Sequence, residues 1–96
     1  MSAHGSTRVE IYDQPYTIGG GDAAYVQRLA DRVDAKMRQV ARETRVVDSL
    51  RVAVLAAINL ADENETLRAK VESLEARANE KARKLNQRLD DVLRAS

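Results

Sequence analysis

Few residues of this sequence belong to the types that carry catalytic chemistry. His4 is the single histidine and cysteine is absent, so neither a thiol nucleophile nor a histidine-based acid–base pair can be assembled. No second metal ligand lies near His4 in the sequence. The carboxylates alternate with lysine and arginine, as they do on solvent-facing helices. We therefore expect no enzyme activity, no metal and no cofactor.

Two local clusters resemble ligand sites but lack the required spacing. Residues 62–65 are Asp-Glu-Asn-Glu, yet consecutive helical residues point around the helix axis and do not converge on one cation. Residues 19–21 are three glycines, but no Gly-Lys-Ser/Thr follows to complete a phosphate loop. The sequence therefore predicts no metal or phosphate site here, and the glycines are interpreted as a flexible linker.

Basic residues are concentrated near the C-terminus. The segment 77–88 has five basic residues and one acidic residue, whereas the segment 62–75 has five acidic and two basic. In a parallel pair of helices these segments would repel, while an antiparallel pair brings opposite charges together.

Nucleic-acid binding stays open as an alternative use of the basic segment 77–88, although stacking aromatics and a known binding signature are missing. The net charge of +1 gives no general attraction to polyanions.

A second group of arginines lies nearer the N-terminus. Residues 23–43 carry apolar side chains every three or four positions, which predicts an amphipathic helix. Arg38 and Arg42 lie opposite its apolar stripe, with Asp31 as the acidic residue on that side, and Arg45 follows in the connection. These three arginines are the predicted docking surface for an acidic protein partner. The alternative is a basic face that contacts only solvent.

A long helix, predicted from Asp48 to Arg94, must position the charged segments 62–75 and 77–88. The stretch contains neither proline nor glycine, and Asp48 is a good N-cap. Such a helix is about 70 Å long at ~1.5 Å per residue, so much of it must pack on another chain. The alternative, a helix folded back on its own domain, would need a covering segment of similar length. Its apolar run near Leu55 is interrupted by Arg51 and too short to cross a bilayer.

The apolar residues after the first turns predict a coiled coil. Leu60, Leu67 and Leu74 are seven residues apart, which is the heptad spacing, and the series continues beyond a stutter near residues 78–82. We call this series, from Leu60 to Val92, the apolar seam. The predicted oligomer interface consists of Val54, Leu55, Ile58, Asn59, Leu60, Leu67, Val71, Leu74, Ala78, Leu85, Leu89 and Val92.

The N-terminal part predicts a small head. Residues 1–7 are expected to be disordered, and residues 8–19 alternate in the manner of a β-hairpin. With a loop at Asp13 and Gln14, Ile11 would face Tyr16 and Val9 would face Ile18. The expected organisation is an α+β head at residues 8–61 and an oligomeric C-terminal coiled coil at 62–96, with the helix continuous from about residue 49. Without a signal peptide, the protein is expected to be cytoplasmic.

Four segments resemble ZapA, a family of bacterial cell-division proteins. They are residues 9–18 (VEIYDQPYTI), 25–30 (YVQRLA), 33–38 (VDAKMR) and 51–63 (RVAVLAAINLADE). The last is the most specific, because it is close to the family's LAVLAALNIADEL motif. The chain departs from the family pattern at Asp13, where a glycine is common, and in its glycine-rich residues 19–21.

The resemblance implies both an assembly and a function. ZapA-like proteins form dimers and, through antiparallel coiled coils, tetramers. They bind FtsZ, the tubulin-like division GTPase, and cross-link its filaments at the mid-cell division ring. The resemblance thus implies FtsZ and further copies of this chain as partners. A coiled-coil protein that binds nucleic acid, or a general adaptor, is the alternative.

Overall fold

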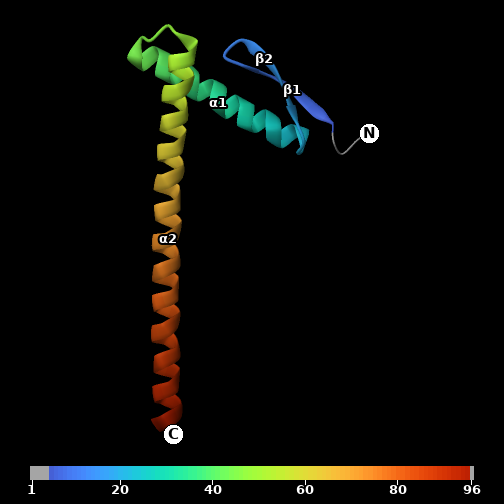
Figure 1. Ribbon diagram of the computed structural model, residues 1–96. Coiled ribbons are helices and arrows are strands. Elements are labelled where there is room, and N and C mark those ends of the chain that lie inside the picture. Colours follow the sequence, from blue (N-terminus) through green and yellow to red (C-terminus); the bar gives the residue numbers. More distant parts are fainter. Residues whose placement is uncertain (1–4, 96) are drawn as a thin grey trace. The chain divides into compact units, whose positions relative to one another are not determined.

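The computed structural model describes residues 5–95. It contains strands β1 (Ser6–Ile11) and β2 (Gln14–Gly19), followed by helices α1 (Ala23–Thr44) and α2 (Ser49–Ala95), as Figure 1 shows. The predicted α+β class, with a hairpin, a shorter helix and a long C-terminal helix, is confirmed. The chain divides into two compact units, Met1–Ala61 and Asp62–Ser96.

The hairpin has a different register from the predicted one. Its loop is Tyr12–Asp13, so Val9 pairs with Tyr16 and Thr7 pairs with Ile18. The predicted loop at Asp13–Gln14 was therefore wrong, and each pair is shifted by two residues. Because the shift is even, the apolar side chains keep to one face of the hairpin.

The start of β1 also corrects the expected disorder of residues 1–7. Ser6 and Thr7 belong to the strand, because they pair with the end of β2 and extend the ladder. The backbone N–H of Gly20 also donates to the carbonyl of Gly5. Residues 1–4 lie outside the described part of the chain.

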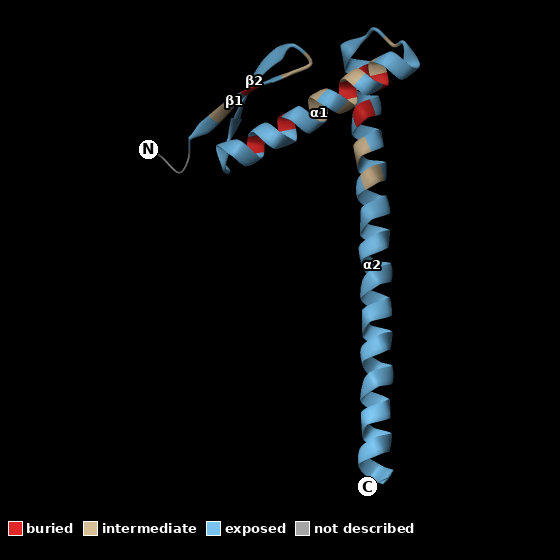
Figure 2. Cartoon of the chain, turned by 180° about the vertical axis from the view of Figure 1, so that it is seen from behind, coloured by how far each residue is buried: buried red, intermediate tan, exposed pale blue. Residues whose placement is uncertain are grey.

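Helix α1 supplies the core of the head through one apolar face. The first half of this face packs on β1, and the second half packs on the first turns of α2. The buried residues appear red in Figure 2. They are Val9, Val26 and Ala30 in one cluster, and Met37, Val40, Val52 and Ala56 in the other. Strand β2 remains exposed along its whole length.

The helix ends follow the expected chemistry only in part. Asp48 caps α2, since its carboxylate accepts a hydrogen bond from the backbone N–H of Leu50 at 3.1 Å. Asp22 occupies the N-cap of α1, but its side chain makes no capping hydrogen bond. Helix α1 ends at Thr44, and its C-cap is Arg45, whose φ of 58° is left-handed and whose N–H donates to the carbonyl of Ala41. That conformation ends the helix before the chain turns into α2.

The first turns of α2 are buried on only one side. Val52 and Ala56 are buried, whereas Leu50 is 70% exposed and Ile58 is 60% exposed. Within one chain α1 therefore covers a single side of this apolar run, and its other side stays exposed. From residue 64 to residue 95 every side chain is exposed, as the pale blue of Figure 2 shows.

Candidate functional site

The three predicted docking arginines lie on two successive turns at the end of α1 and at its C-cap. Arg38 and Arg42 are one turn apart, and Arg45 is the left-handed residue that ends the helix. We call these residues the arginine surface. Arg42 and Arg45 are exposed, whereas Arg38 is only partly exposed. The structure therefore places the three arginines close together but in unequal surroundings.

Arg38 differs from the other two because two carboxylates bind it. Its Nε donates to Asp34 Oδ2 at 3.0 Å, and its Nη2 donates to Asp13 Oδ1 at 2.8 Å. The expectation that Asp31 was the acidic residue on this side was therefore incomplete. Asp34 approaches from one turn earlier on α1, and Asp13 approaches from the hairpin loop.

Asp34 joins the helix to the hairpin. Its Oδ1 accepts the backbone N–H of Tyr12 at 2.7 Å, while its other oxygen accepts from Arg38. These two hydrogen bonds, chiefly the one from Arg38, lower the pKa of Asp34 below its ordinary value. In turn Asp34, and then Asp13, raise the pKa of the Arg38 guanidinium.

Replacing Asp34 by asparagine is expected to lower stability more at neutral pH than in acid. The two hydrogen bonds stabilise the ionised form of Asp34 in the folded state. In the unfolded state these bonds are absent and the pKa of the aspartate is about 3.9. Its contribution is therefore present above about pH 4 and is lost as the pH falls through the lowered pKa of the folded state. Urea unfolding of both proteins at pH 7 and near pH 3 measures this difference.

The control for that comparison is Asp31→Asn. Asp31 lies on the same helix and accepts a hydrogen bond from the exposed Gln27 at 2.9 Å, without contacting the hairpin. We expect this variant to unfold as the wild type does at both pH values. An equal loss of stability for Asp34→Asn at pH 7 and pH 3 would contradict a role for the Asp34 charge.

Sequence reasoning missed Tyr12, Asp13 and Asp34 as members of this site. One signal was present, because Asp34 and Arg38 have the i, i+4 spacing of a helical ion pair. The contacts of Tyr12 and Asp13 carried no such signal. Their partners lie 22 and 25 residues further along the chain, so only folding of the hairpin onto α1 brings them together.

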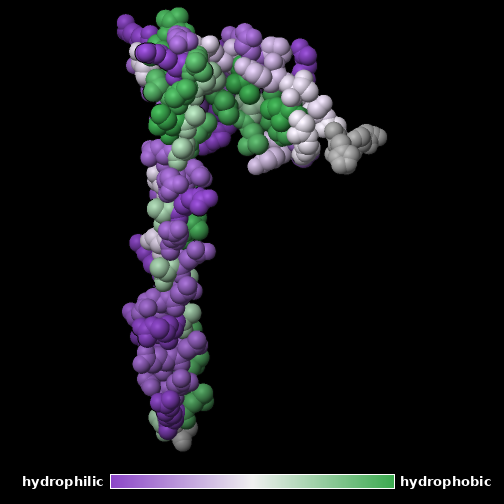
Figure 3. All heavy atoms as spheres, in the orientation of Figure 1, coloured by the Kyte–Doolittle hydropathy of each residue, from purple (hydrophilic) through white to green (hydrophobic). Residues whose placement is uncertain are grey.

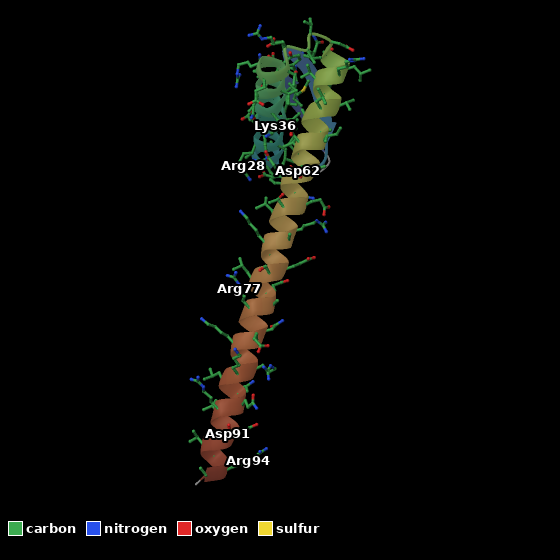
Figure 4. All side chains as sticks on the ribbon, turned by 90° about the vertical axis from the view of Figure 1, so that its left-hand side faces the viewer. Arg28, Lys36, Asp62, Arg77, Asp91 and Arg94 are labelled. Atoms are coloured by element: carbon green, nitrogen blue, oxygen red, sulfur yellow. The ribbon has the colours of Figure 1, made fainter. Side chains whose placement is uncertain are left out.

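The predicted oligomer interface is largely exposed in the single chain. Leu60 is partly buried, and the other predicted interface residues are exposed, including Leu67 at 55% and Leu74 at 62%. In Figure 3 green side chains gather over the head and recur along the lower part of α2. Figure 4 shows side chains projecting from that helix on all sides, among them the labelled Arg77, Asp91 and Arg94.

The head also has an apolar groove of about 820 Å³. The hairpin supplies one wall through Tyr16 and Ile18, and α1 supplies another through Val33 and Met37. The first turns of α2 contribute Leu50 to the same groove. Tyr16, Ile18 and Leu50, three of its lining residues, are exposed in the single chain.

Neither a metal-binding cluster nor a membrane-spanning helix occurs within residues 5–95. This part of the chain contains no group of three or more histidine, cysteine or acidic side chains placed to hold a metal ion. None of its helices combines the length and apolar character needed to cross a membrane. His4 lies outside the described residues.

The head thus carries the arginine surface, and the long helix carries an exposed apolar seam. The family model described as "Cell division protein ZapA" matches residues 7–89. This chain belongs to the ZapA family. Among its relatives, "Cell division protein ZapA" of Halalkalibacterium halodurans is 39% identical over 70 residues, which cover 72% of this chain and 77% of that protein. The Bacillus subtilis protein of the same name is 37% identical over 76 residues, covering 78% and 89%.

Two solved structures share this fold, and one of them bears the ZapA name. One is described as a "ZapA mutant dimer from Geobacillus stearothermophilus" and matches with a TM-score of 0.64 and 29% identity, covering 82% of this chain and 93% of that chain. An "Unknown conserved bacterial protein from Pseudomonas aeruginosa PAO1" matches with a TM-score of 0.70 and 28% identity, covering 90% and 97%. The expected resemblance to ZapA is confirmed.

Proposed function

We propose that this ZapA family member is a non-enzymatic cytoplasmic protein that binds FtsZ filaments and cross-links them at the mid-cell division ring. In this way it promotes assembly and stability of the ring. The observation that carries the proposal is that a chain of this family leaves its apolar seam exposed from residue 64 onward. A seam of this kind joins several copies, and each copy brings a head of its own.

The proposed assembly has two levels. Residues 8–61 form the head and residues 62–96 form the coiled coil. Two chains associate as a homodimer, a step supported by the dimeric Geobacillus neighbour. Two dimers then associate through antiparallel coiled coils, because the acidic segment 62–75 of one helix attracts the basic segment 77–88 of the other.

Such an assembly explains how weak contacts can bundle filaments. Heads separated by a helical spacer engage two filaments at once, and the second contact benefits from a high effective concentration. Each single head can then bind weakly without losing the cross-link. We propose that the arginine surface makes this contact with an acidic surface of FtsZ, which makes docking sensitive to salt.

The test is bundling of FtsZ filaments, measured by low-speed sedimentation across a salt series. We expect the wild-type protein to sediment filaments and Arg38→Glu/Arg42→Glu/Arg45→Glu to lose at least about tenfold in apparent affinity, since reversed charges repel the partner. Circular dichroism and molecular mass first establish that the variant folds and assembles. Duplex DNA assayed in parallel tests the alternative of nucleic-acid binding.

The matched control reverses three other arginines of the head, namely Arg8→Glu/Arg28→Glu/Arg32→Glu. It changes the net charge equally but leaves the arginine surface intact. We expect this control to keep bundling. If the folded variant of the arginine surface bundles FtsZ like the wild type at every salt concentration, the docking surface lies elsewhere. If the wild type sediments no filaments, the proposed function itself is wrong.

A further inference from the structure

The hairpin loop adopts a conformation that its own residues do not favour. Tyr12 has a φ of 52° and Asp13 has a φ of 66°, so both central residues are left-handed, as in a type I′ turn. Asn-Gly is the favoured pair for that turn, and a tyrosine with positive φ is uncommon. Contacts outside the loop must therefore help to hold it.

Those contacts come from α1, and Arg38 takes part in most of them. The side chain of Arg38 binds Asp13 of the loop and also Asp34, which accepts the N–H of Tyr12. Its guanidinium also lies over the Tyr12 ring, with Cζ 5.6 Å from the ring centroid. These contacts of Arg38 thus all serve the hairpin loop or the residue that holds it.

The electrostatics of Arg38 differ accordingly from those of its neighbours. The guanidinium of Arg38 lies between the carboxylates of Asp13 and Asp34. Their negative charges offset its positive charge, so Arg38 adds no positive potential to the surface at longer range. Within residues 5–95 the side chains of Arg42 and Arg45 form no ion pair. The positive potential available to an acidic partner therefore comes from Arg42 and Arg45.

A shallow hollow lies where these groups meet. It has a volume of about 250 Å³ and is lined by Tyr12, Arg38, Ala41 and Arg42. Of the five N–H donors of Arg38, Asp34 and Asp13 take two. The hollow thus combines the free guanidinium of Arg42 with the ring of Tyr12, and the position of that ring depends on the loop.

We propose that the three residues of the arginine surface have two different roles, one positioning the hairpin loop and the others docking the partner. Arg38 holds the hairpin loop on α1, and Arg42, assisted by Arg45, binds a carboxylate of the acidic partner beside Tyr12. This inference rests on the proposed docking to FtsZ and names the chemistry of the contact. It gives Arg38 a positioning role in place of the docking role expected from the sequence.

The experiment uses Asp13→Gly as a rescue background. Glycine adopts positive φ without strain, so this substitution favours the turn locally and removes its dependence on Arg38. We expect Arg38→Gln in the otherwise wild-type chain to speed hydrogen exchange of the Tyr12 amide and to weaken FtsZ binding about tenfold. In the Asp13→Gly background, Arg38→Gln should weaken binding by less than about twofold.

Arg42→Gln is the comparison that separates the two roles. We expect it to weaken FtsZ binding about tenfold in both backgrounds, since a lost contact with the partner cannot be rescued by the loop. Tyr12 exchange should stay at the wild-type rate. Melting temperature and molecular mass are measured for every variant, so that binding is compared only among folded and assembled proteins.

Two results would overturn the division of roles. If Arg38→Gln weakens binding equally with and without Asp13→Gly, Arg38 contacts FtsZ itself. If Arg38→Gln leaves Tyr12 exchange unchanged, Arg38 does not hold the loop. Failure of the wild type to bind FtsZ refutes the proposed function and the docking role of Arg42 with it, and Tyr12 exchange then still decides the positioning role of Arg38.

Discussion

Replacing Leu74 with glutamate is expected to separate the proposed tetramer into dimers while leaving the head folded. Leu74 lies in the apolar seam and is 62% exposed in the single chain, so in a coiled coil its side chain would be buried against another helix. A buried, unpaired carboxylate costs several kcal/mol. That penalty corresponds to a loss of at least about a hundredfold in association. Leu67→Glu, one heptad earlier, should act in the same way.

Sedimentation velocity at low micromolar concentration measures the effect. The matched control is Ala76→Glu, which adds the same charge two residues along the helix and about 160° around its axis from Leu74. We expect the control to keep the wild-type mass. An unchanged mass distribution for both leucine variants would show that the seam does not hold the assembly together.

Replacing Val52 with alanine is expected to destabilise the head by about 2–3 kcal/mol. Val52 is 0% exposed and belongs to the cluster formed with Met37, Val40 and Ala56. The substitution removes two buried methyl groups at about 0.8 kcal/mol each and leaves a cavity. In a head of this size the melting temperature should fall by about 10 °C or more.

Val47→Ala is the matched control. It is the same valine-to-alanine substitution, but Val47 is 88% exposed. We expect it to alter stability by less than about 0.5 kcal/mol. All proteins must be unfolded at one concentration, since association contributes to apparent stability. Equal effects at the two valines would contradict the core assigned to the head.

The hairpin shows where reasoning from sequence was limited. Alternation of apolar residues correctly placed Val9, Ile11, Tyr16 and Ile18 on one face, because that pattern depends only on the two-residue period of a strand. The loop was wrong by one residue. Its actual residues, Tyr12 and Asp13, are not the residues that a type I′ turn favours, and contacts with Asp34 and Arg38 compensate for them.

The site shows the same division between local and distant interactions. The helical period placed the arginine surface correctly at the end of α1, opposite the apolar stripe. Apart from the i, i+4 spacing of Asp34 and Arg38, the sequence offered no reason to treat Arg38 differently from Arg42, because both lie on the same side of one helix. The difference arises from Asp13, which is 25 residues away in sequence and reaches Arg38 only after the hairpin packs on α1.

By itself the sequence determined the two helices, the strand pairing of the N-terminal segment and the apolar seam. These features follow from side-chain periodicity, from Asp48 as a helix cap and from the absence of proline and glycine in α2, all of which act within a few turns or one heptad. Only the tertiary structure decided the register of the hairpin and the partners of Arg38. Both depend on contacts between elements far apart in sequence, whose combined free energy outweighs the local preference of the loop residues.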